Sequence, residues 1–558
     1  MNANKPQWWQ DAVIYQIYPK SFQDSGSKGT GDLQGIIRRL DYLKQLGVDA
    51  LWLTPIYPSP QVDHGYDVQD YYDIDPCYGT MADFEELLSA AHARGLRVIM
   101  DIVVNHTSTQ HPWFQSAIAD RDSPYRDFYI WRDPVDGHEP NNWRSEFGGS
   151  AWQLDVATSQ YYLHLFAIEQ ADLNWENPQV RDEVKKIFRF WAAKGVDGFR
   201  LDVINLISKD QDFPSGANGG GSEYYTDGPR VHEFLKEMHR DAFGPAGVMT
   251  VGEMASTSLA NCVQYSAPGG DELSMVFNFH HMNVDYANGE KWTKAPVEFL
   301  TLKNVFNYWQ QGMHGKGWNA LFWCNHDQPR IVSRFGDEGA LREISAKMLA
   351  TALYGMQGTP YLYQGEEIGM TNPGYSTIDD YRDVESCNIF NALRSIGMPE
   401  GQILAILASK SRDNSRTPMQ WSDEPNAGFT EGTPWIKVAA NYTHLNVAAA
   451  LADPASVFWY YRELIALRKA HAIFREGLYE DALPGHPRLW AYTRRWQGHK
   501  LMVLCNFYAS EEIFQMPESW AEEGRITRLI SNYADTPEAP ASGYLRAYEA
   551  VMWLDSAT

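Results

Sequence analysis

The stretch VDGFRLDVI at residues 196–204 is a short apolar segment, rich in β-branched and aromatic residues, with an arginine and an aspartate near its end. Its near-continuous apolar character is typical of a strand buried on both faces of a parallel sheet. A segment with helical spacing, residues 179–194, precedes it. The stretch therefore indicates one unit of a parallel sheet, with charged side chains where the strand ends.

Seven further segments of the same kind occur along the chain, and helix-like segments separate them. They are residues 12–18, 48–54, 96–104, 248–254, 275–279, 319–324 and 359–363. Eight strand-then-helix units within about 370 residues predict an α/β fold, a (β/α)₈ TIM barrel. A doubly wound sheet is the alternative, but no strand is followed by the GxGxxG fingerprint of that fold.

The spacing of these units divides the chain into four segments. The third strand is followed by about 65 residues rich in Pro, Asn, Gly and Trp, which is too long for an ordinary loop. We therefore expect the barrel to comprise residues 1–106 and 172–480, with an inserted subdomain at residues 107–171. Apolar and polar residues alternate towards the end of the chain, as in RLWAYTRRW and KLMVLCNFY. This pattern predicts an antiparallel β domain over residues 481–558.

Composition excludes several classes of partner. The 47 Lys and Arg against 71 Asp and Glu give a formal net charge of −24, which is unsuited to binding nucleic acid or an anionic membrane. The five cysteines form no CxxC pair, so we expect reduced thiols. The first 20 residues lack the pattern of a signal peptide. We expect a cytoplasmic protein with no nucleic acid, membrane or obligate protein partner.

Carboxylates stand where three of the expected strands end. Asp202 follows the fourth strand, Glu253 ends the fifth, and Asp327 follows the seventh. Catalytic groups of (β/α)₈ barrels lie at these ends, so the three side chains should converge on one mouth. With 20 Trp and 31 Tyr available to contact sugar rings, such a cluster indicates glycoside hydrolysis.

That chemistry needs two carboxyl groups in different protonation states. Arg200 lies two residues before Asp202, on the same face of the strand, and is expected to hold the pKa of Asp202 down. Glu253 must keep a proton, and its apolar neighbours Val251 and Met254 are compatible with a raised pKa. The sequence positions alone leave open whether hydrolysis retains or inverts the anomeric configuration.

Four segments, DIVVNH, GFRLDVI, VGEM and NHDQPR, occur in this order and resemble the signature regions of the α-amylase-type family of retaining glycoside hydrolases. The resemblance covers nearly the whole chain, from WWQDAVIYQIYPKSF through SRDNSRTPMQW to the terminal β domain. It implies that Asp202 is the nucleophile, Glu253 the general acid/base, and Asp327 the carboxylate that grips the sugar hydroxyls. The glucosyl pocket that it implies is lined by Asp63, Tyr66, His106, Phe166, Gln170, Arg200, His326 and Arg412.

Within that family the chain is similar to the oligo-1,6-glucosidase group, especially to members that act on a phosphorylated disaccharide. Val203, after the expected nucleophile, resembles members that prefer α-1,6 or α-1,1 bonds. Where relatives carry FEHM, this chain carries FHHM with His280 and His281, and Lys291 follows. These three residues are the expected phosphate ligands. The resemblance thus implies hydrolysis of α,α-trehalose 6-phosphate to glucose and glucose 6-phosphate through a covalent glucosyl-enzyme.

Other activities within this resemblance remain open. An oligo-1,6-glucosidase acting on isomaltose is the main alternative, and a transglucosylase or a sucrose isomerase is less favoured. The stretch IVSRFGDE after NHDQPR lacks the charged segment of sucrose isomerases. A non-catalytic transporter subunit of this type would lose the carboxylates and gain a transmembrane helix.

The first loop differs from the calcium-binding loop of relatives, which carries a DxNxDxxxD pattern. Here Asp24 and Asp32 remain, while Gly26 and Lys28 replace two oxygen ligands. Calcium needs about 6–8 oxygen ligands, and a lysine ammonium stands where one would lie. We therefore expect no bound metal and no other cofactor.

Overall fold

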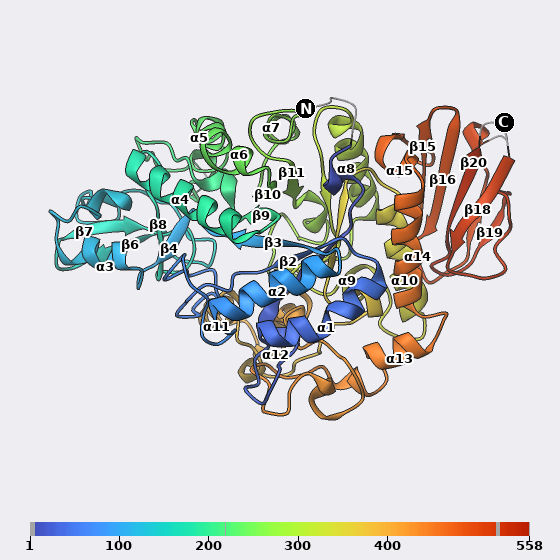
Figure 1. The fold of residues 1–558 in the computed structure, drawn as a ribbon, viewed down its shortest axis with the longest axis horizontal. Helices are drawn as coiled ribbons and strands as arrows, with labels where there is room; N and C mark the ends of the chain where they lie inside the picture. The colour runs from blue at the N-terminus through green and yellow to red at the C-terminus, as the bar shows by residue number, and fades with distance from the viewer. Residues whose placement is uncertain (1–5, 218, 521–524, 557–558) are drawn as a thin grey trace.

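The computed structural model describes residues 6–217, 219–520 and 525–556, and eight parallel strands form the barrel in this part of the chain (Figure 1). They are β1 (Ile14–Ile17), β2 (Ala50–Leu53), β3 (Arg97–Ile102), β9 (Gly198–Leu201), β10 (Met249–Met254), β11 (Met275–Asn278), β12 (Ala320–Leu321) and β13 (Thr359–Tyr363). The sheet order is β11-β10-β9-β3-β2-β1-β13-β12, and a parallel bridge between Val276 and Asn319 closes the ring. The predicted (β/α)₈ barrel is confirmed.

Helices follow the barrel strands, and local sequence sets where they begin and end. The Asp32 side chain accepts a hydrogen bond from the Gly35 N–H at the start of α1, and Gly47 ends that helix at a φ of +96°. Thr80 and Asp83 form a capping box at the start of α2. The principal outer helices are α1 (Leu33–Leu46), α2 (Met81–Ala93), α4 (Pro178–Lys194), α5 (Val231–Met238), α7 (Leu259–Tyr265), α8 (Phe299–Met313), α10 (Arg342–Tyr354) and α14 (Val457–Ala470). Shorter helices are α6 (Gly244–Ala246), α9 (Ile331–Phe335) and α15 (Ile473–Glu476).

The segment after β3 forms a lobe of its own at the left of Figure 1. It contains β4 (His106–Ser108), α3 (Pro112–Ala119), β5 (Trp131–Arg132), β6 (Trp152–Asp155), β7 (Gln160–Leu163) and β8 (Gln170–Asp172). Strand β4 pairs with β8, so the two ends of the insertion meet beside the barrel. A small apolar cluster that includes Trp143 and Leu163 of the insertion also takes up Val203 and Leu206 from the end of β9, which fixes the lobe over the barrel mouth.

The chain ends in an antiparallel sheet at the right of Figure 1. Its order is β14 (Leu478–Asp481), β15 (Leu489–Trp496), β16 (His499–Asn506), β20 (Ala550–Ser556) and β18 (Arg525–Ser531), and β17 (Glu512–Phe514) pairs with β19 (Gly543–Leu545). The Tyr492 hydroxyl donates to the Ala352 carbonyl, and Lys303 Nζ donates to the Leu489 carbonyl, which attaches this sheet to helices α10 and α8. The first strand begins at Leu478, three residues before the position expected from sequence.

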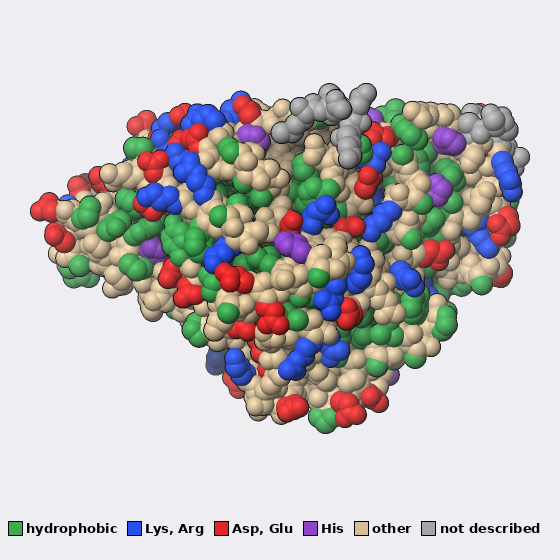
Figure 2. Space-filling model, viewed as in Figure 1, with side chains coloured by type: hydrophobic (Ala, Val, Ile, Leu, Met, Phe, Trp, Pro, Cys, Tyr) green, Lys and Arg blue, Asp and Glu red, His purple; other side chains and the backbone are tan. Residues whose placement is uncertain are grey.

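The connection between β13 and α14 is longer than the sequence patterns suggest. It contains α11 (Val384–Ser395), α12 (Glu400–Lys410) and α13 (Val447–Ala452), which lie below the barrel in Figure 1. On the face shown in Figure 2, basic and acidic side chains are interspersed over the barrel and the insertion. No helix in the described part of the chain is long and apolar enough to cross a membrane.

Candidate active site

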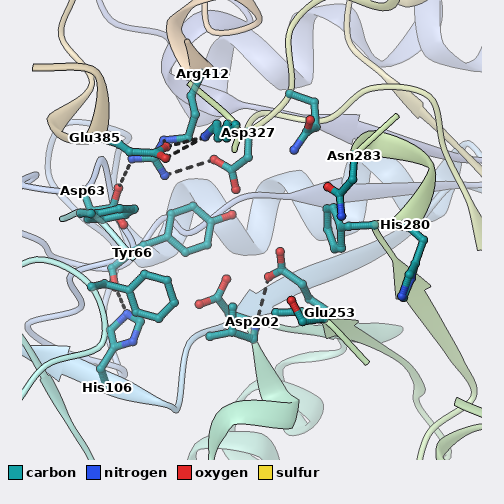
Figure 3. A pocket seen from close by; sticks show the side chains of 18 residues that line it. Asp63, Tyr66, His106, Asp202, Glu253, His280, Asn283, Asp327, Glu385 and Arg412 are labelled. Carbon is teal, nitrogen blue, oxygen red and sulfur yellow. Dashed lines mark hydrogen bonds and ion pairs between the residues drawn. The ribbon is translucent and has the colours of Figure 1, made fainter. Parts of the chain in front are cut away.

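A cavity of about 260 Å³ opens at the carboxyl ends of the barrel strands. Figure 3 shows Asp63 and His106 at one end, His280 and Asn283 at the other, and Asp202 and Glu253 between them. Ten of the predicted site residues line this cavity: Asp63, Tyr66, His106, Phe166, Asp202, Glu253, His280, Lys291, Asp327 and Arg412. Three predicted residues, Gln170, Arg200 and His326, lie one layer beneath the lining and hold it in place.

Arg200 lies buried under the centre of the cavity and binds three carboxylates. Its Nη1 donates to Asp202 Oδ1 at 2.6 Å and to Asp101 Oδ1 at 2.8 Å, and its Nη2 donates to Glu253. The strands dictate this arrangement, because Asp101, Arg200 and Glu253 come from the neighbouring strands β3, β9 and β10 and Asp202 follows β9 directly. Three carboxylates therefore compete for one guanidinium.

Burial raises the pKa of both central carboxyl groups, although both bind Arg200. Burial raises the pKa of Asp202 to about 7, since the lowering effect of Arg200 is smaller and Asp101 adds to the rise. Burial raises the pKa of Glu253 to about 8, again against Arg200 and with help from Asp202. The expectation that Arg200 holds the pKa of Asp202 down is wrong in its net direction, because desolvation outweighs the ion pair. Glu253 nevertheless keeps its proton to a higher pH than Asp202 does.

Asp327 is in the opposite state, because two guanidinium groups and the His326 ring lie against it. Arg416 Nη2 donates to Asp327 Oδ1 at 2.7 Å, Arg412 Nη1 donates to it at 3.3 Å, and His326 Nε2 lies 3.2 Å from Oδ2. Burial would raise the pKa of Asp327, but these neighbours outweigh it and hold the pKa well below its ordinary range. Arg412 also donates to Asp63 Oδ1 at 3.0 Å. Asp327 is thus a fixed anion that faces the cavity.

The end of the cavity predicted to bind the glucosyl ring is built from stacked rings and side-chain hydrogen bonds. The Tyr66 ring lies parallel to the His326 ring with centroids 5.2 Å apart. Gln170 Nε2 lies 3.1 Å from Asp63 Oδ2 and 3.2 Å from His106 Nε2. Burial lowers the pKa of His106 to about 4, so that its ring is neutral at pH 7. Polar groups with fixed orientation therefore alternate here with aromatic faces, as a sugar site requires.

Only two of the three predicted phosphate ligands, His280 and Lys291, line the cavity. Lys291 Nζ donates to both carboxylate oxygens of Glu385 at 2.8 and 2.7 Å. His281 is 4% exposed and points away from the cavity, with its Nε2 2.9 Å from the Phe322 carbonyl oxygen. The assignment of His281 as a phosphate ligand is wrong, because successive residues of this short helical turn face different directions.

Val203 holds an unusual backbone conformation between the two central carboxylates. Its φ of +35° lies in the left-handed region, where a β-branched residue is strained. This conformation points the Val203 N–H at Glu253 Oε2, 3.2 Å away. The strained residue that follows Asp202 thus donates a backbone hydrogen bond to the Glu253 carboxyl group.

Four charged residues of the site, Asp101, Asp383, Glu385 and Arg416, are not among those predicted from sequence. Asp101 lies inside the third strand, so the same strand-end reasoning extended a few residues back would have found it. Asp383 caps the N-terminus of helix α11, in the long connection after β13, and Glu385 lies in the first turn of that helix. Both lie against Arg412, at 2.5 and 3.5 Å. No local pattern marks them, because only the fold brings this connection over the barrel mouth.

The first loop is held by hydrogen bonds within the protein. Asp24 accepts from the N–H groups of Gly26 and Gly29, and Asp32 accepts from Ser25 and Gly35. Lys28 is exposed. No group of three His, Cys, Asp or Glu residues in the described ranges has the arrangement of a metal site.

A parallel barrel whose mouth holds two carboxyl groups with raised pKa values on one guanidinium, beside a sugar-sized cavity with aromatic walls, has the site of a glycoside hydrolase. Residues 16–477 match the family described as alpha amylase, catalytic domain, and the chain belongs to this family. The chain is 62% identical to the trehalose-6-phosphate hydrolase of Escherichia coli (strain K12), over 98% of this chain and 99% of the relative. It is 51% identical to an oligo-1,6-glucosidase of Parageobacillus thermoglucosidasius, over 98% of both chains. The crystal structure of Bacillus licheniformis trehalose-6-phosphate hydrolase superposes with a TM-score of 0.95 at 56% identity, over 98% of this chain and all of that one.

Proposed function

We propose that this protein is a retaining α-glucosidase that hydrolyses α,α-trehalose 6-phosphate to glucose and glucose 6-phosphate. The observation that carries the proposal is the placement of Asp202 and Glu253 on one guanidinium, in a cavity that His280 and Lys291 also line. The 62% identity to a trehalose-6-phosphate hydrolase over nearly the whole chain supports the choice of substrate.

The geometry supports retention. Asp202 and Glu253 bind adjacent nitrogens of Arg200, which keeps the two carboxyl groups close together. Retaining enzymes hold their carboxyl groups about 5–5.5 Å apart, whereas inverting enzymes need about 6.5–9.5 Å to admit a water molecule between them. Two carboxyl groups on one guanidinium fit the shorter separation of a retaining enzyme.

In the first step the Asp202 carboxylate attacks the anomeric carbon, and the bond to the leaving oxygen breaks. Glu253 gives its proton to that oxygen, so that glucose 6-phosphate leaves as a neutral alcohol at the cleaved position. The higher pKa of Glu253 suits this division, because Asp202 loses its proton first as the pH rises. The fixed anion Asp327, with Arg412, is placed to bind hydroxyls of the glucosyl ring.

In the second step a water molecule takes the place of the leaving alcohol. Glu253, now ionised, accepts a proton from this water, whose oxygen attacks the anomeric carbon and releases Asp202. Two inversions at one carbon give net retention, and both carboxyl groups return to their starting states. The enzyme then releases α-glucose.

His280 and Lys291 are the residues that we assign to the phosphate. Both follow β11 and line the cavity. His280 lies at the end opposite Asp63 and His106, whereas the Lys291 ammonium lies against Glu385. A phosphate dianion would draw the Lys291 ammonium from Glu385 and form charge-assisted hydrogen bonds with it. The acid that relatives carry in FEHM would repel the same group.

We further propose that the protein works in the cytoplasm, without a metal, other cofactor, nucleic acid, membrane or obligate protein partner. A phosphorylated disaccharide is charged, and phosphorylation coupled to uptake would deliver it inside the cell. The degraded pattern around Asp24 and Lys28 supports the absence of calcium.

Initial rates on trehalose 6-phosphate, trehalose and isomaltose test the proposal, with glucose and glucose 6-phosphate detected separately. We expect a strong preference for trehalose 6-phosphate, with both products formed in equal amounts. A preference for isomaltose would overturn the substrate assignment, leave the roles of the carboxylates standing, and favour the oligo-1,6-glucosidase activity of the 51% identical relative.

A further inference from the structure

The loop that follows β11 forms the wall of the cavity where the leaving group would lie. His280, Asn283 and Lys291 of this loop line the cavity. Asp285 lies on the same loop but is buried, with its side chain turned away from the cavity residues into a cluster of cations. The catalytic mechanism uses neither Asp285 nor its partners.

Asp285 joins two cations that come from different parts of the barrel rim. Arg334 Nε donates to Asp285 Oδ2 at 2.9 Å, and Arg334 Nη2 donates to Oδ1 at 2.6 Å, which is a two-point contact. Lys410 Nζ lies 2.6 Å from Oδ2 and donates to the Asp285 carbonyl oxygen at 3.0 Å. All three side chains are at most 7% exposed.

Each cation is linked in turn to another wall of the active site. Arg334 lies in α9, and its Nη1 donates to Gln328 Oε1 at 2.9 Å; Gln328 lines the cavity next to Asp327. Lys410 is the last residue of α12, two residues before Arg412. The Asp285 carboxylate thus connects the loop after β11 to the segments that carry Asp327 and Arg412.

Open space lies behind this part of the loop. A surface cavity of about 540 Å³ is lined by Asp285, Lys294, Val297, Arg334 and Lys410 among others. Lys294 and Pro296 are exposed at this cavity, although Val297 packs against the core. The ion pairs of Asp285 are therefore among the contacts that fix the loop on this side, together with the hydrogen bond from Arg334 to the Met282 carbonyl oxygen.

We propose that Asp285 is a positioning residue, which holds the loop that carries His280, Asn283 and Lys291 against the leaving group of the substrate. That the substrate is trehalose 6-phosphate, with glucose 6-phosphate as its leaving group, rests on the proposed function. Without the carboxylate charge, Arg334 and Lys410 repel each other, and only their hydrogen bonds to the carbonyl oxygens of Met282 and Asp285 still attach the loop to α9 and α12. The glucosyl pocket keeps its own contacts, since Asp63, Tyr66 and His106 lie at the other end of the cavity.

The test compares two substrates that share the glucosyl group and differ in the leaving group. Trehalose 6-phosphate needs the loop, whereas α-glucosyl fluoride has a single-atom leaving group that reaches none of its residues. For Asp285→Asn we expect KM for trehalose 6-phosphate to rise at least about tenfold, the loss of one well-placed charged contact. We expect kcat/KM for α-glucosyl fluoride to change less than twofold.

Asp555→Asn is the matched control, because Asp555 is also a buried aspartate beside a lysine, Lys500, but lies in the C-terminal sheet. It should lower the melting temperature without changing either KM. Equal losses on both substrates in Asp285→Asn, or no change in either, would overturn the proposal. If Asp285→Asn does not fold, Lys410→Gln removes one of the two attachments and should raise the same KM by at least about threefold.

The same data separate the two proposals. Wild-type protein that prefers isomaltose would overturn the proposed substrate, and the comparison would then use isomaltose against α-glucosyl fluoride. The positioning role of Asp285 would stand or fall on that pair in the same way.

Discussion

The ammonium of Lys291 lies 2.8 and 2.7 Å from the two carboxylate oxygens of Glu385, and both residues line the substrate cavity. Glu385 in turn lies 3.5 Å from Arg412. A basic and an acidic side chain thus face the second sugar together, so the phosphate must compete with Glu385 for one cation. The Lys291 ammonium therefore has a partner in both states: Glu385 when the site is empty, and the phosphate when substrate is bound.

Replacing Lys291 by methionine should harm the phosphorylated substrate alone. A charge-assisted hydrogen bond contributes about 1.5–3 kcal/mol, so KM for trehalose 6-phosphate should rise roughly 10- to 100-fold. Turnover of trehalose should change little, since trehalose carries no phosphate. Steady-state kinetics on both sugars measure the difference. Lys294→Met is the matched control, because Lys294 is an exposed lysine of the same loop that lies outside the substrate cavity. Equal losses on trehalose would contradict a phosphate role for Lys291.

The roles of the two central carboxyl groups can be told apart with azide. Asp202→Gly should lose at least about 10⁴-fold in kcat, as expected for loss of a covalent nucleophile. Azide can then attack the anomeric carbon directly, and a single inversion gives β-glucosyl azide. Glu253→Ala should still form the glucosyl-enzyme from α-glucosyl fluoride, and azide should release it as α-glucosyl azide. NMR spectroscopy of the products reads the configuration. The same anomer from both variants would contradict the assignment.

The pH dependence should follow the same two groups. Asp202 must be ionised, and its pKa of about 7 predicts that kcat/KM falls as the pH drops below this value. Glu253 must be protonated, and its pKa of about 8 predicts a second fall as the pH rises above it. With trehalose as substrate both limbs should appear. With α-glucosyl fluoride only the acid limb should remain, because fluoride leaves without a proton. An alkaline limb with fluoride would assign that titration to another group.

Much of the fold follows from local sequence. All eight barrel strands lie within the segments that the apolar runs predict, because strands buried on both faces leave a continuous apolar signal. The connection between β13 and α14 was not foreseen as a separate helical region. Its helices α11 and α12 pack on a small cluster that includes Tyr381 and Phe390, and a short apolar cluster of this kind leaves no long periodic pattern.

The site residues likewise divide into those that their sequence position predicts and those that only tertiary packing brings to the cavity. Asp202, Glu253 and Asp327 stand at strand ends, where sequence position alone indicates a shared mouth. Glu385 reaches the cavity through tertiary packing, which no local pattern encodes. The direction in which His281 points depends on the geometry of one helical turn, and the net pKa of Asp202 depends on the balance of burial against Arg200. Both are properties of three-dimensional surroundings, which the sequence states only indirectly.

Calcium removal should leave the enzyme unchanged. The carboxylate oxygens of Asp24 and Asp32 accept hydrogen bonds from N–H and hydroxyl groups nearby in the chain, and Lys28 of the same loop carries a positive charge. We expect activity and melting temperature after dialysis against EDTA to match those of untreated protein. Added calcium should have no effect either. Loss of either property on dialysis, with recovery on adding calcium, would contradict the expectation.

The raised pKa of Glu253 also predicts a stability cost that depends on pH. Burial raises this pKa from 4.5 to about 8, so between these values the folded protein holds a proton that the unfolded chain releases. Stability conferred by the proton is therefore complete below pH 4.5 and is lost as the pH rises towards 8, by an amount on the order of a few kcal/mol. Glu253→Gln carries no such proton, so its melting temperature should exceed that of the wild type by several degrees at pH 8 and match it at pH 4.5.

Glu549→Gln is the matched control, because its effect on stability should depend on pH in the opposite direction. Burial would raise the pKa of Glu549, but hydrogen bonds from Arg546 outweigh it and lower the pKa, so its ionised form stabilises the fold above pH 4.5. Glu549→Gln should therefore lower the melting temperature at pH 8, and this loss should shrink as the pH falls below 4.5. Thermal unfolding of both variants across this range measures the two slopes. Equal shifts for the two variants would show that Glu253 carries no buried proton, and the general acid would then have to be sought elsewhere in the cavity.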